Sequence, residues 1–171
     1  MAYTTPRTWA TNDAISAARL NTDLRDNPAF LATPPSCRVY KSAALAHAGG
    51  GTEYVTFTLE RFDTDTMHDA ASNTSRITAK TAGKYLIGGH VEFAAGVTGQ
   101  RGLSIRHQGA TTIAAHLYDA TASGVCQASI STYYVLAINE YVELGVYSNS
   151  ALNANASGNY SIEFWAVWQS L

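Results

Sequence analysis

Tyr54-Val55-Thr56-Phe57-Thr58-Leu59 alternates apolar and polar side chains over its whole length. Successive side chains of a β-strand point to opposite faces, so this alternation indicates a strand with one buried face. Comparable stretches recur toward the end of the sequence, separated by turns rich in Gly, Asn, Asp and Ser. The predicted strands are residues 76–79, 84–94, 102–107, 111–117, 127–137, 141–148 and 160–168.

The spacing of these strands indicates the fold class. No amphipathic helix of about 10–15 residues lies between them, which favours a sandwich or barrel over a parallel α/β sheet. We therefore predict an all-β domain of antiparallel strands over residues 37–171. Residues 85–93 carry apolar groups on both faces of the strand, which predicts that something covers the second face as well.

Residues 1–36 have a different pattern and are predicted to form a short helical arm. Ala17, Leu20 and Leu24 recur at helical spacing, and Thr11 or Asn12 is placed to cap this helix. We expect Asn27-Pro28 to end the helix, because proline removes a backbone donor. Residues 33–36 contain two consecutive prolines, which predict a stiff joint before the β domain.

The helix of the arm has only one apolar stripe. Isolated helices this short are marginal in water, so we expect the arm to dock on another protein. The apolar residues expected to make that contact are Trp9, Ala17, Leu20, Leu24, Phe30 and Leu31.

Composition excludes several functions. The net charge is −2 and 14% of the residues are charged, which argues against the basic patch of a nucleic-acid-binding protein. No apolar run approaches the roughly 18 residues of a membrane span, and the start lacks a signal-peptide pattern, so we expect assembly in a cytoplasm. In that reducing compartment, Cys37 and Cys126 are expected to be small buried residues rather than a disulfide.

The β domain also resembles a known family. Val55-x-Phe57 leads to Phe62-Asp63, Gly83-Lys84-Tyr85-Leu86-Ile87 follows a polar turn, and residues 133–144 form two strands around a tight turn. This order resembles the jelly roll of the tumour necrosis factor and complement globular-head family. Asn139-Glu140 departs from the Gly-Asp usual at that turn, and Phe164-Trp165-Ala166 only loosely matches the family's closing Phe-x-Gly.

This resemblance implies an antiparallel jelly-roll sandwich that forms a homotrimer through an aromatic-rich sheet face. The ten tyrosines fit such an interface, because aromatic side chains bury large areas while their polar ends find partners. The residues expected at the trimer interface are Tyr85, Phe93, Tyr134, Tyr147 and Trp165.

The first residues resemble a second group of proteins. Tyr3-Thr4-Thr5-Pro6-Arg7-Thr8-Trp9, Ala17-Ala18-Arg19-Leu20-Asn21-Thr22 and Leu24-Arg25-Asp26-Asn27 are similar to the opening segment of small tail, fibre and head-surface proteins of bacteriophages. The resemblance implies a structural protein of the virion, assembled in the cytoplasm of the bacterial host and attached to capsid or tail proteins.

Two locations on the virion are open. A capsid decoration or head-fibre protein needs only an anchor and a knob, whereas a tail fibre usually has a shaft between them, so the head is favoured. The alternative is a minor tail protein that binds a glycan of the host surface through the loop 148–159, which is rich in Asn, Ser and Ala.

Catalytic and metal sites are weakly indicated. The five histidines lack metal-ligand spacing, and no Gly-x-Ser-x-Gly motif occurs. Residues 63–69 concentrate oxygen ligands suited to Ca²⁺, but a solvated polar loop is the favoured interpretation. Glu140 with Glu143, or Glu92 with Glu163, would mimic a glycosidase pair, although exposed strand and turn positions account for them. We predict no enzyme activity, no catalytic residues, no metal and no cofactor.

Overall fold

A computed structural model describes residues 3–95, 99–120, 124–155 and 161–171 of the chain. Its arm contains one continuous helical stretch made of α1 (Ala17–Leu20), the π-helical segment η1 (Asn21–Asp26) and α2 (Asn27–Ala32). The cap is Ser16, whose hydroxyl accepts from the Arg19 N–H at 3.3 Å. The prediction of a cap at Thr11 or Asn12 is wrong, because those residues belong to the Ala10–Asp13 turn that precedes the helix.

The helix also continues past Asn27-Pro28, contrary to the sequence prediction. The N–H of Asn27 donates to the Thr22 carbonyl, so the turn before the proline is a wide π turn. Pro28 then occupies the first turn of α2, where a missing N–H disrupts no bond within that helix. The helix ends at Ala32, just before the two prolines.

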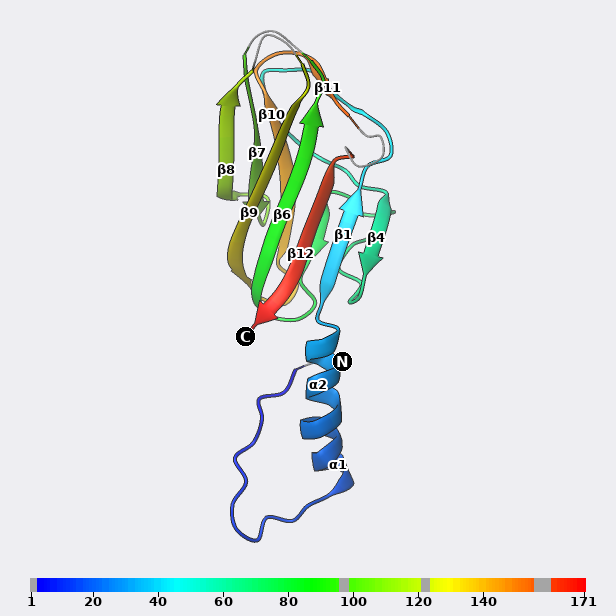
Figure 1. Ribbon diagram of the computed structural model, residues 1–171, viewed down its shortest axis with the longest axis vertical. Helices are drawn as coiled ribbons and strands as arrows, with labels where there is room; N and C mark the ends of the chain where they lie inside the picture. Colours follow the sequence, from blue (N-terminus) through cyan, green and yellow to red (C-terminus); the bar gives the residue numbers. More distant parts are fainter. Residues whose placement is uncertain (1–2, 96–98, 121–123, 156–160) are drawn as a thin grey trace.

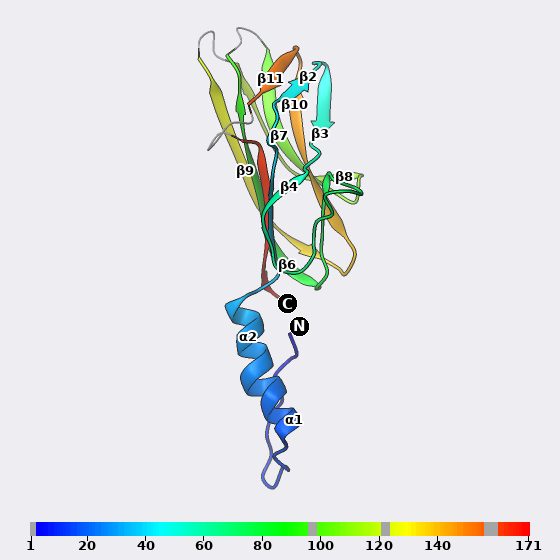
Figure 2. The same ribbon diagram turned by 90° about the vertical axis from the view of Figure 1, so that its right-hand side faces the viewer.

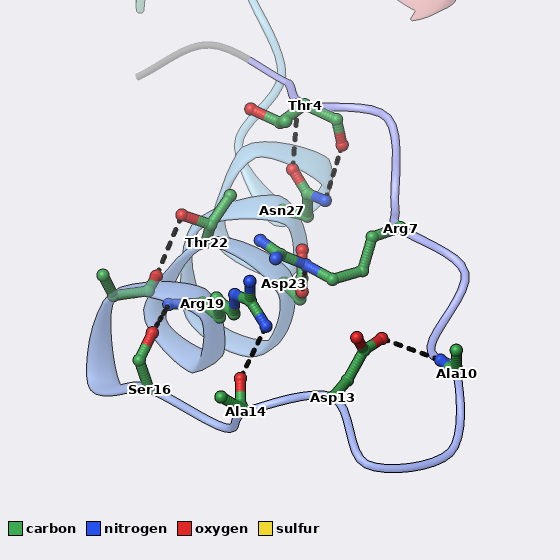
Figure 3. A network of polar contacts seen from close by, with 11 residues as sticks. Thr4, Arg7, Ala10, Asp13, Ala14, Ser16, Arg19, Thr22, Asp23 and Asn27 are labelled. Atoms are coloured by element: carbon green, nitrogen blue, oxygen red, sulfur yellow. Dashed lines mark hydrogen bonds and ion pairs between the residues drawn. The ribbon is translucent and has the colours of Figure 1, made fainter.

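Residues 3–16 fold back beside the helix (Figures 1 and 3). The side-chain amide of Asn27 accepts from the Thr4 N–H at 3.0 Å and donates to the Thr4 carbonyl at 2.7 Å. Arg7 forms an ion pair with Asp23 at 2.7 Å. The arm therefore has polar contacts of its own, which the sequence had not indicated.

Seven antiparallel strands form the sheet that joins the arm: β1 (Ser36–Tyr40), β2 (Leu45–His47), β4 (Leu59–Asp63), β6 (Gly83–Phe93), β9 (Cys126–Leu136), β11 (Leu152–Ala154) and β12 (Glu163–Ser170). Their order is β2-β11-β6-β12-β1-β4. Strand β9 pairs with β6 along the edge opposite to β11 and β12.

A five-stranded sheet packs against the first (Figures 1 and 2). It contains β3 (Gly51–Tyr54), β5 (Arg76–Thr78), β7 (Gln100–His107), β8 (Thr111–Asp119) and β10 (Tyr141–Ser148). The order is β3-β10-β7-β8, with β5 paired to β10. The two layers form an antiparallel jelly-roll sandwich, so the predicted all-β fold behind a short helical arm is confirmed.

The core lies between the two sheets and follows the alternation seen in the sequence. In the alternating stretch Tyr54–Leu59, Val55 and Phe57 are buried and Thr56 and Thr58 are exposed. Strand pairing nevertheless stops at Tyr54 and resumes in β4, so this stretch spans two strands and their extended connection. The burial prediction is confirmed, whereas the prediction of one strand is wrong.

Three aromatic rings join the arm to the sandwich. Phe30 of α2 lies edge-on to Trp168 of β12, with ring centroids 4.8 Å apart. Tyr3 lies within 6.2 Å of both rings. Phe30 is 4% exposed, so it is a contact within the chain and not the external anchor that the sequence suggested.

We predict that Asn27→Ala releases residues 3–16 from the helix, because both backbone groups of Thr4 lose their bonds to the side chain of Asn27, which is 4% exposed. The local cost is about 1–3 kcal/mol. Hydrogen exchange should show faster exchange of the Thr4 amide and its neighbours, with the sandwich unchanged. The control is Asn21→Ala, an exposed asparagine on the same helix; equal exchange in both variants would contradict the assignment.

Candidate functional site

The five aromatic residues predicted for the trimer interface do not lie together. Tyr85 and Phe93 are fully buried between the sheets, and the Tyr85 hydroxyl donates to the Thr81 carbonyl at 2.6 Å. Burial raises the pKa of Tyr85 above its ordinary value. Both residues occupy the inward positions of β6, so their expected place at the interface has to be corrected: they are core residues.

The other three predicted residues occupy three different surfaces. Tyr134 lies on the inward side of β9, half-buried, with its ring 5.0 Å from that of His107. Tyr147 is half-buried on the outer side of β10 in the five-stranded sheet, between the inward residues Val146 and Ser148. Trp165 is half-buried on the outer side of the seven-stranded sheet.

The strand register around Trp165 assembles an apolar surface. Trp165 pairs with Gly88 of β6 on one side and with Arg38 of β1 on the other, and Arg38 pairs with Phe62 of β4. One register step along, Val167 pairs with Leu86 and Leu86 with Tyr133 of β9. We call this surface the outer apolar face and define it as Phe62, Leu86, Tyr133, Val135, Trp165 and Val167.

Much of the outer apolar face is exposed to solvent. Tyr133 is 60% exposed, Val135 65% and Phe62 45%, and the remaining members are half-buried. Contiguous apolar patches of this kind on a soluble domain mark interaction surfaces. The outer apolar face is therefore the candidate functional site.

Gly88 shapes the centre of the outer apolar face. A Cβ atom at this position would lie 2.5 Å from Cζ2 of Trp165, so only glycine leaves room for the indole. A hollow of about 230 Å³ lies beside the indole, lined by Arg38, Phe62, His90, Trp165 and Val167. A second hollow of about 420 Å³ is lined by Lys84, Tyr133, Tyr134 and Val135. These two hollows have space for side chains of a partner.

A buried carboxylate borders the outer apolar face. Glu163 is 3% exposed and accepts from the guanidinium groups of Arg38 and Arg61, the latter at 2.9 Å. The Arg38 guanidinium lies 5.8 Å from the Trp165 ring centroid, within the range of a cation–π contact. The carboxylate is thus paired on both oxygens, which suits a structural role.

The other carboxylates weighed as catalytic pairs also have partners. Glu143 accepts from Arg106 and from the Ser75 hydroxyl, and Glu92 accepts from Gln127 and Asn155. Glu92, Glu143 and Glu163 are buried, so the expectation that they occupy exposed positions is wrong. Glu140 at the β9–β10 turn accepts from the Ala137 N–H, which lowers the pKa of its carboxyl.

The acidic loop of residues 63–69 uses its carboxylates to hold its own backbone. Asp63 accepts from the N–H groups of Asp65 and His68, and Asp69 accepts from those of Ala71 and Ser72. The two bonds from Ala71 and Ser72 lower the pKa of Asp69. Within the described part of the chain, no group of three or more His, Cys, Asp or Glu is arranged to hold a metal ion.

Two further features were singled out in the sequence, the loop 148–159 and the two cysteines. In the loop 148–159, Asn149 accepts from the Gln100 N–H at 2.9 Å, while residues 156–159 lie outside the described residues. Cys37 is fully buried, which raises the pKa of its thiol; Cys126 is half-buried, and both are free cysteines.

The arm exposes most of the residues predicted to anchor it. Leu24 is 71% exposed, Leu31 56%, Trp9 42% and Leu20 38%, and Ala17 is exposed too. Ile15, which is 72% exposed, adds to this apolar surface and was not among the predicted anchor residues. No described helix is long and apolar enough to cross a membrane.

Comparison with solved structures identifies the architecture. The globular domain of zebrafish complement 1qA protein aligns over 78% of this chain and 96% of its own, with a TM-score of 0.58 and 13% sequence identity. Murine APRIL at pH 5.0 aligns over 78% and 98%, with a TM-score of 0.58 and 11% identity. The fold is a TNF- and complement-like jelly roll. No protein family matches the sequence, and neither does any curated protein.

Sequence reasoning missed most of this jelly roll's outer apolar face. Leu86, Tyr133 and Val167 each lie next to an inward-facing residue, and the prediction, which selected aromatic residues, chose the inward Tyr85 and Tyr134 in place of Leu86 and Tyr133. The alternation around Trp165 contained the signal, because residues two apart on one strand share a face. Val167 follows Trp165 by two positions, and Val135 follows Tyr133 in the same way.

We predict that His90 makes the stability of the sandwich sensitive to acid. Burial lowers its pKa below the ordinary 6.5, and Arg38 lowers it further, while Glu163 and a backbone bond to Ser161 oppose the shift. The folded state therefore favours neutral His90. Its contribution is intact above pH 6.5 and is lost as the pH falls toward the folded-state pKa.

The measurement is the melting temperature at pH 7.5 and at pH 5.5. His90→Gln should reduce the fall on acidification, whereas His116→Gln, at an exposed histidine of β8, should leave it unchanged. An unaltered fall in His90→Gln would show that other groups set the acid response.

Proposed function

We propose that the chain is a non-enzymatic structural protein of a bacteriophage particle, a trimeric knob attached to the virion surface by its helical arm. One observation carries the proposal: the same molecule has an exposed apolar face on its β domain and an arm that projects from that domain. The resemblance of residues 3–27 to phage head and tail proteins supplies the virion context.

The outer apolar face supports self-association of the knob. Tyr133 and Val135 lie on β9, an edge strand of the seven-stranded sheet, and Leu117 of β8, an edge strand of the five-stranded sheet, is 55% exposed. The face near Trp165 and this edge are different surfaces of one subunit. An edge of one copy against the face of the next is a head-to-tail contact, which closes into a ring when the rotation fits. Three copies are the number implied by the fold resemblance.

The arm supports attachment at a distance from the knob. The helix extends from the sandwich along the long axis of the molecule (Figures 1 and 2), and the Ala10–Asp13 turn lies at the opposite end of the arm from the knob (Figure 3). Trp9 and Ile15 flank that turn with 42% and 72% of their surface exposed. An apolar end of this kind suits insertion into another protein of the particle.

The proposed location is the virion, with assembly in the host cytoplasm and the head favoured over the tail. The test is the copy number and position of the chain on purified particles of the phage whose genome encodes it, by quantitative gel and antibody-labelled electron microscopy. Hundreds of copies over the head support a decoration or head-fibre role. A few copies at the tail tip favour the alternative, a minor tail protein that binds a host glycan.

We predict that Tyr133→Asp converts the trimer to monomers, because it places a charge on the outer apolar face where the neighbouring copy would cover it. Light scattering across a concentration series gives the mass. The melting temperature of the monomeric variant should stay within a few degrees of that of the unmodified chain, since Tyr133 contributes little to the core. Thr52→Asp, at an exposed position of β3, is the matched control and should remain trimeric; a trimeric Tyr133→Asp variant would refute this interface.

We also predict that Trp9→Asp lowers the occupancy of the chain on particles at least about tenfold, the effect of a charge at a buried apolar contact. Particles lacking the chain are incubated with purified variant and re-isolated, and bound protein is quantified. Thr8→Asp adds the same charge one residue earlier at another exposed position and should bind normally. Full occupancy with Trp9→Asp would show that the end of the arm is not part of the attachment site.

A further inference from the structure

A hollow of about 470 Å³ lies on the outer side of the five-stranded sheet. One wall is β5, whose side chains Arg76 and Thr78 point outward because Ile77 between them is buried in the core. The other wall is the loop of residues 66–73, which is joined to β5 by a bond of 2.7 Å from the Thr78 N–H to the Met67 carbonyl. The exposed or half-buried side chains with hydrogen-bond donors that line the hollow are Thr66, Ser72, Asn73, Arg76, Thr78 and Lys80.

Two cations of this lining have donors to spare. Lys80 makes no hydrogen bond or ion pair with any residue that the structure describes. Arg76 lies over the Tyr141 ring, 4.0 Å from its centroid, and its only carboxylate contact among the described residues is with Glu143, at 4.0 Å from Nε. A guanidinium held flat on a ring presents its terminal donors in a fixed plane, which suits a carboxylate or phosphate group.

Negative charge in the hollow is turned away from these cations. Asp69 supplies the only carboxylate in the described lining. Its Oδ1 accepts from the N–H groups of Ala71 at 2.8 Å and Ser72 at 3.0 Å, so the carboxylate is engaged by its own loop. The positive charge of Arg76 and Lys80 is therefore available to an anionic ligand.

The loop wall of the hollow is held in place by buried side chains. Met67 is 1% exposed. The His68 ring is fully buried, with Nδ1 2.9 Å from a Glu60 carboxylate oxygen and Nε2 3.3 Å from the Thr74 carbonyl. A site that is formed before its ligand arrives loses less conformational entropy on binding. These contacts indicate that the hollow is such a site.

Thr66 at the edge of the hollow has a backbone conformation that threonine rarely adopts. Its φ is +53°, in the left-handed region, where a β-branched residue is an outlier. Glycine or asparagine enters this region at lower cost. Elsewhere in the described part of the chain, the non-glycine residues with positive φ are Asn12, Asn73, Gln108 and Asn139. Strained residues gather at ligand sites, so the strain at Thr66 indicates that its side chain has a role there.

The hollow stays open in the proposed trimer. It lies on the outer side of the five-stranded sheet, whereas the outer apolar face belongs to the seven-stranded sheet. Strand β5 pairs with β10 along the edge that also pairs with β3, and β7 and β8 lie beyond the other edge of β10. Neither of the surfaces assigned to the trimer contact therefore covers it.

We propose that this hollow binds an acidic saccharide, with Arg76 and Lys80 holding its carboxylate or phosphate group and Thr66, Asn73 and Thr78 bonding to its hydroxyl groups. The volume lies within the range of small-molecule sites, roughly 300–1,000 Å³, and the polar lining favours a hydroxyl-rich ligand. Two cations match one anionic group and not the long row of charges of a nucleic acid. This binding site adds a function to the proposed structural role and does not depend on the trimer.

The test is titration of the full chain, followed through the amide NMR signals of residues 66–80. Four probes separate the two parts of the proposed ligand. Glucuronate and glucose 6-phosphate carry both an anionic group and sugar hydroxyls, glucose lacks the charge, and inorganic phosphate lacks the hydroxyls. The stronger of the two acidic sugars tells whether a carboxylate or a phosphate is preferred.

The expected result is a saturable shift with an acidic sugar, and binding of glucose and of inorganic phosphate that is at least about tenfold weaker. Equal affinity for inorganic phosphate would overturn the saccharide and leave a simple anion site. Equal affinity for glucose would overturn the role of the charge. No saturable shift with either acidic sugar would overturn the site itself.

A lysine variant tests the cationic part of the hollow. Lys80→Gln should weaken binding of the preferred acidic sugar about tenfold, because one charged hydrogen bond is lost. The matched control is Lys84→Gln, at an exposed lysine of β6 in the other sheet, which should bind normally. Unchanged affinity in Lys80→Gln, or an equal loss in the control, would contradict the assignment.

A threonine variant separates ligand contact from a structural role. Thr66→Asn should leave the melting temperature unchanged or raise it, because asparagine tolerates the left-handed conformation, and should weaken binding about fivefold through loss of the hydroxyl contact. Thr58→Asn, at an exposed threonine outside the hollow, is the control. Full affinity in Thr66→Asn would overturn the contact between Thr66 and the sugar.

Discussion

The alternation of side chains along β6 and β12 is the constraint on which the rest of the structure depends. The two strands are paired in a fixed register, with Trp165 opposite Gly88 and Val167 opposite Leu86. A slip of one residue would send Trp165 and Val167 into the core and bring Phe164 and Ala166 to the surface. Gly88 reinforces the register, since no other residue leaves space for the Trp165 ring. The same alternation of side chains therefore forms both the core and the outer apolar face.

Each sheet also carries one buried glutamate held between two arginines, and each arginine lies over an aromatic ring. On the seven-stranded sheet Glu163 pairs with Arg38 and Arg61, and Arg61 lies 4.0 Å from the Tyr40 ring centroid. On the five-stranded sheet Glu143 has Arg106 over Tyr54 at 3.3 Å and Arg76 over Tyr141 at 4.0 Å. Burying a carboxylate is costly unless it is fully paired. Two arginines with aromatic support satisfy that requirement while remaining partly in solvent.

The sequence predicted the long strands well, because β6, β7, β9 and β10 each carry enough alternating residues to show their period. It missed β1, β2 and β11. Of these, β2 and β11 have three residues each and are defined only by partners far along the chain. The arm was placed correctly but its cap and end were not, since the π turn that accommodates Pro28 has no simple sequence signature. Tyr85 and Phe93 were misplaced at the interface for a different reason: alternation separates two faces without saying which is inward. Tyr85 and Leu86 were equally plausible until the second sheet was in place.

The contact among the rings of Tyr3, Phe30 and Trp168 determines how a force on the arm is transmitted to the β sandwich. The arm continues covalently into β1 and packs through Phe30 on Trp168 of β12, and these two strands are antiparallel neighbours in the middle of the seven-stranded sheet. Both run roughly along the long axis of the molecule (Figure 1). Hydrogen bonds between antiparallel strands lie perpendicular to the strands, so a pull on the arm loads those between β1 and its neighbours together, in shear. A β domain that is loaded through this arm resists unfolding better than one whose strands would be peeled apart bond by bond.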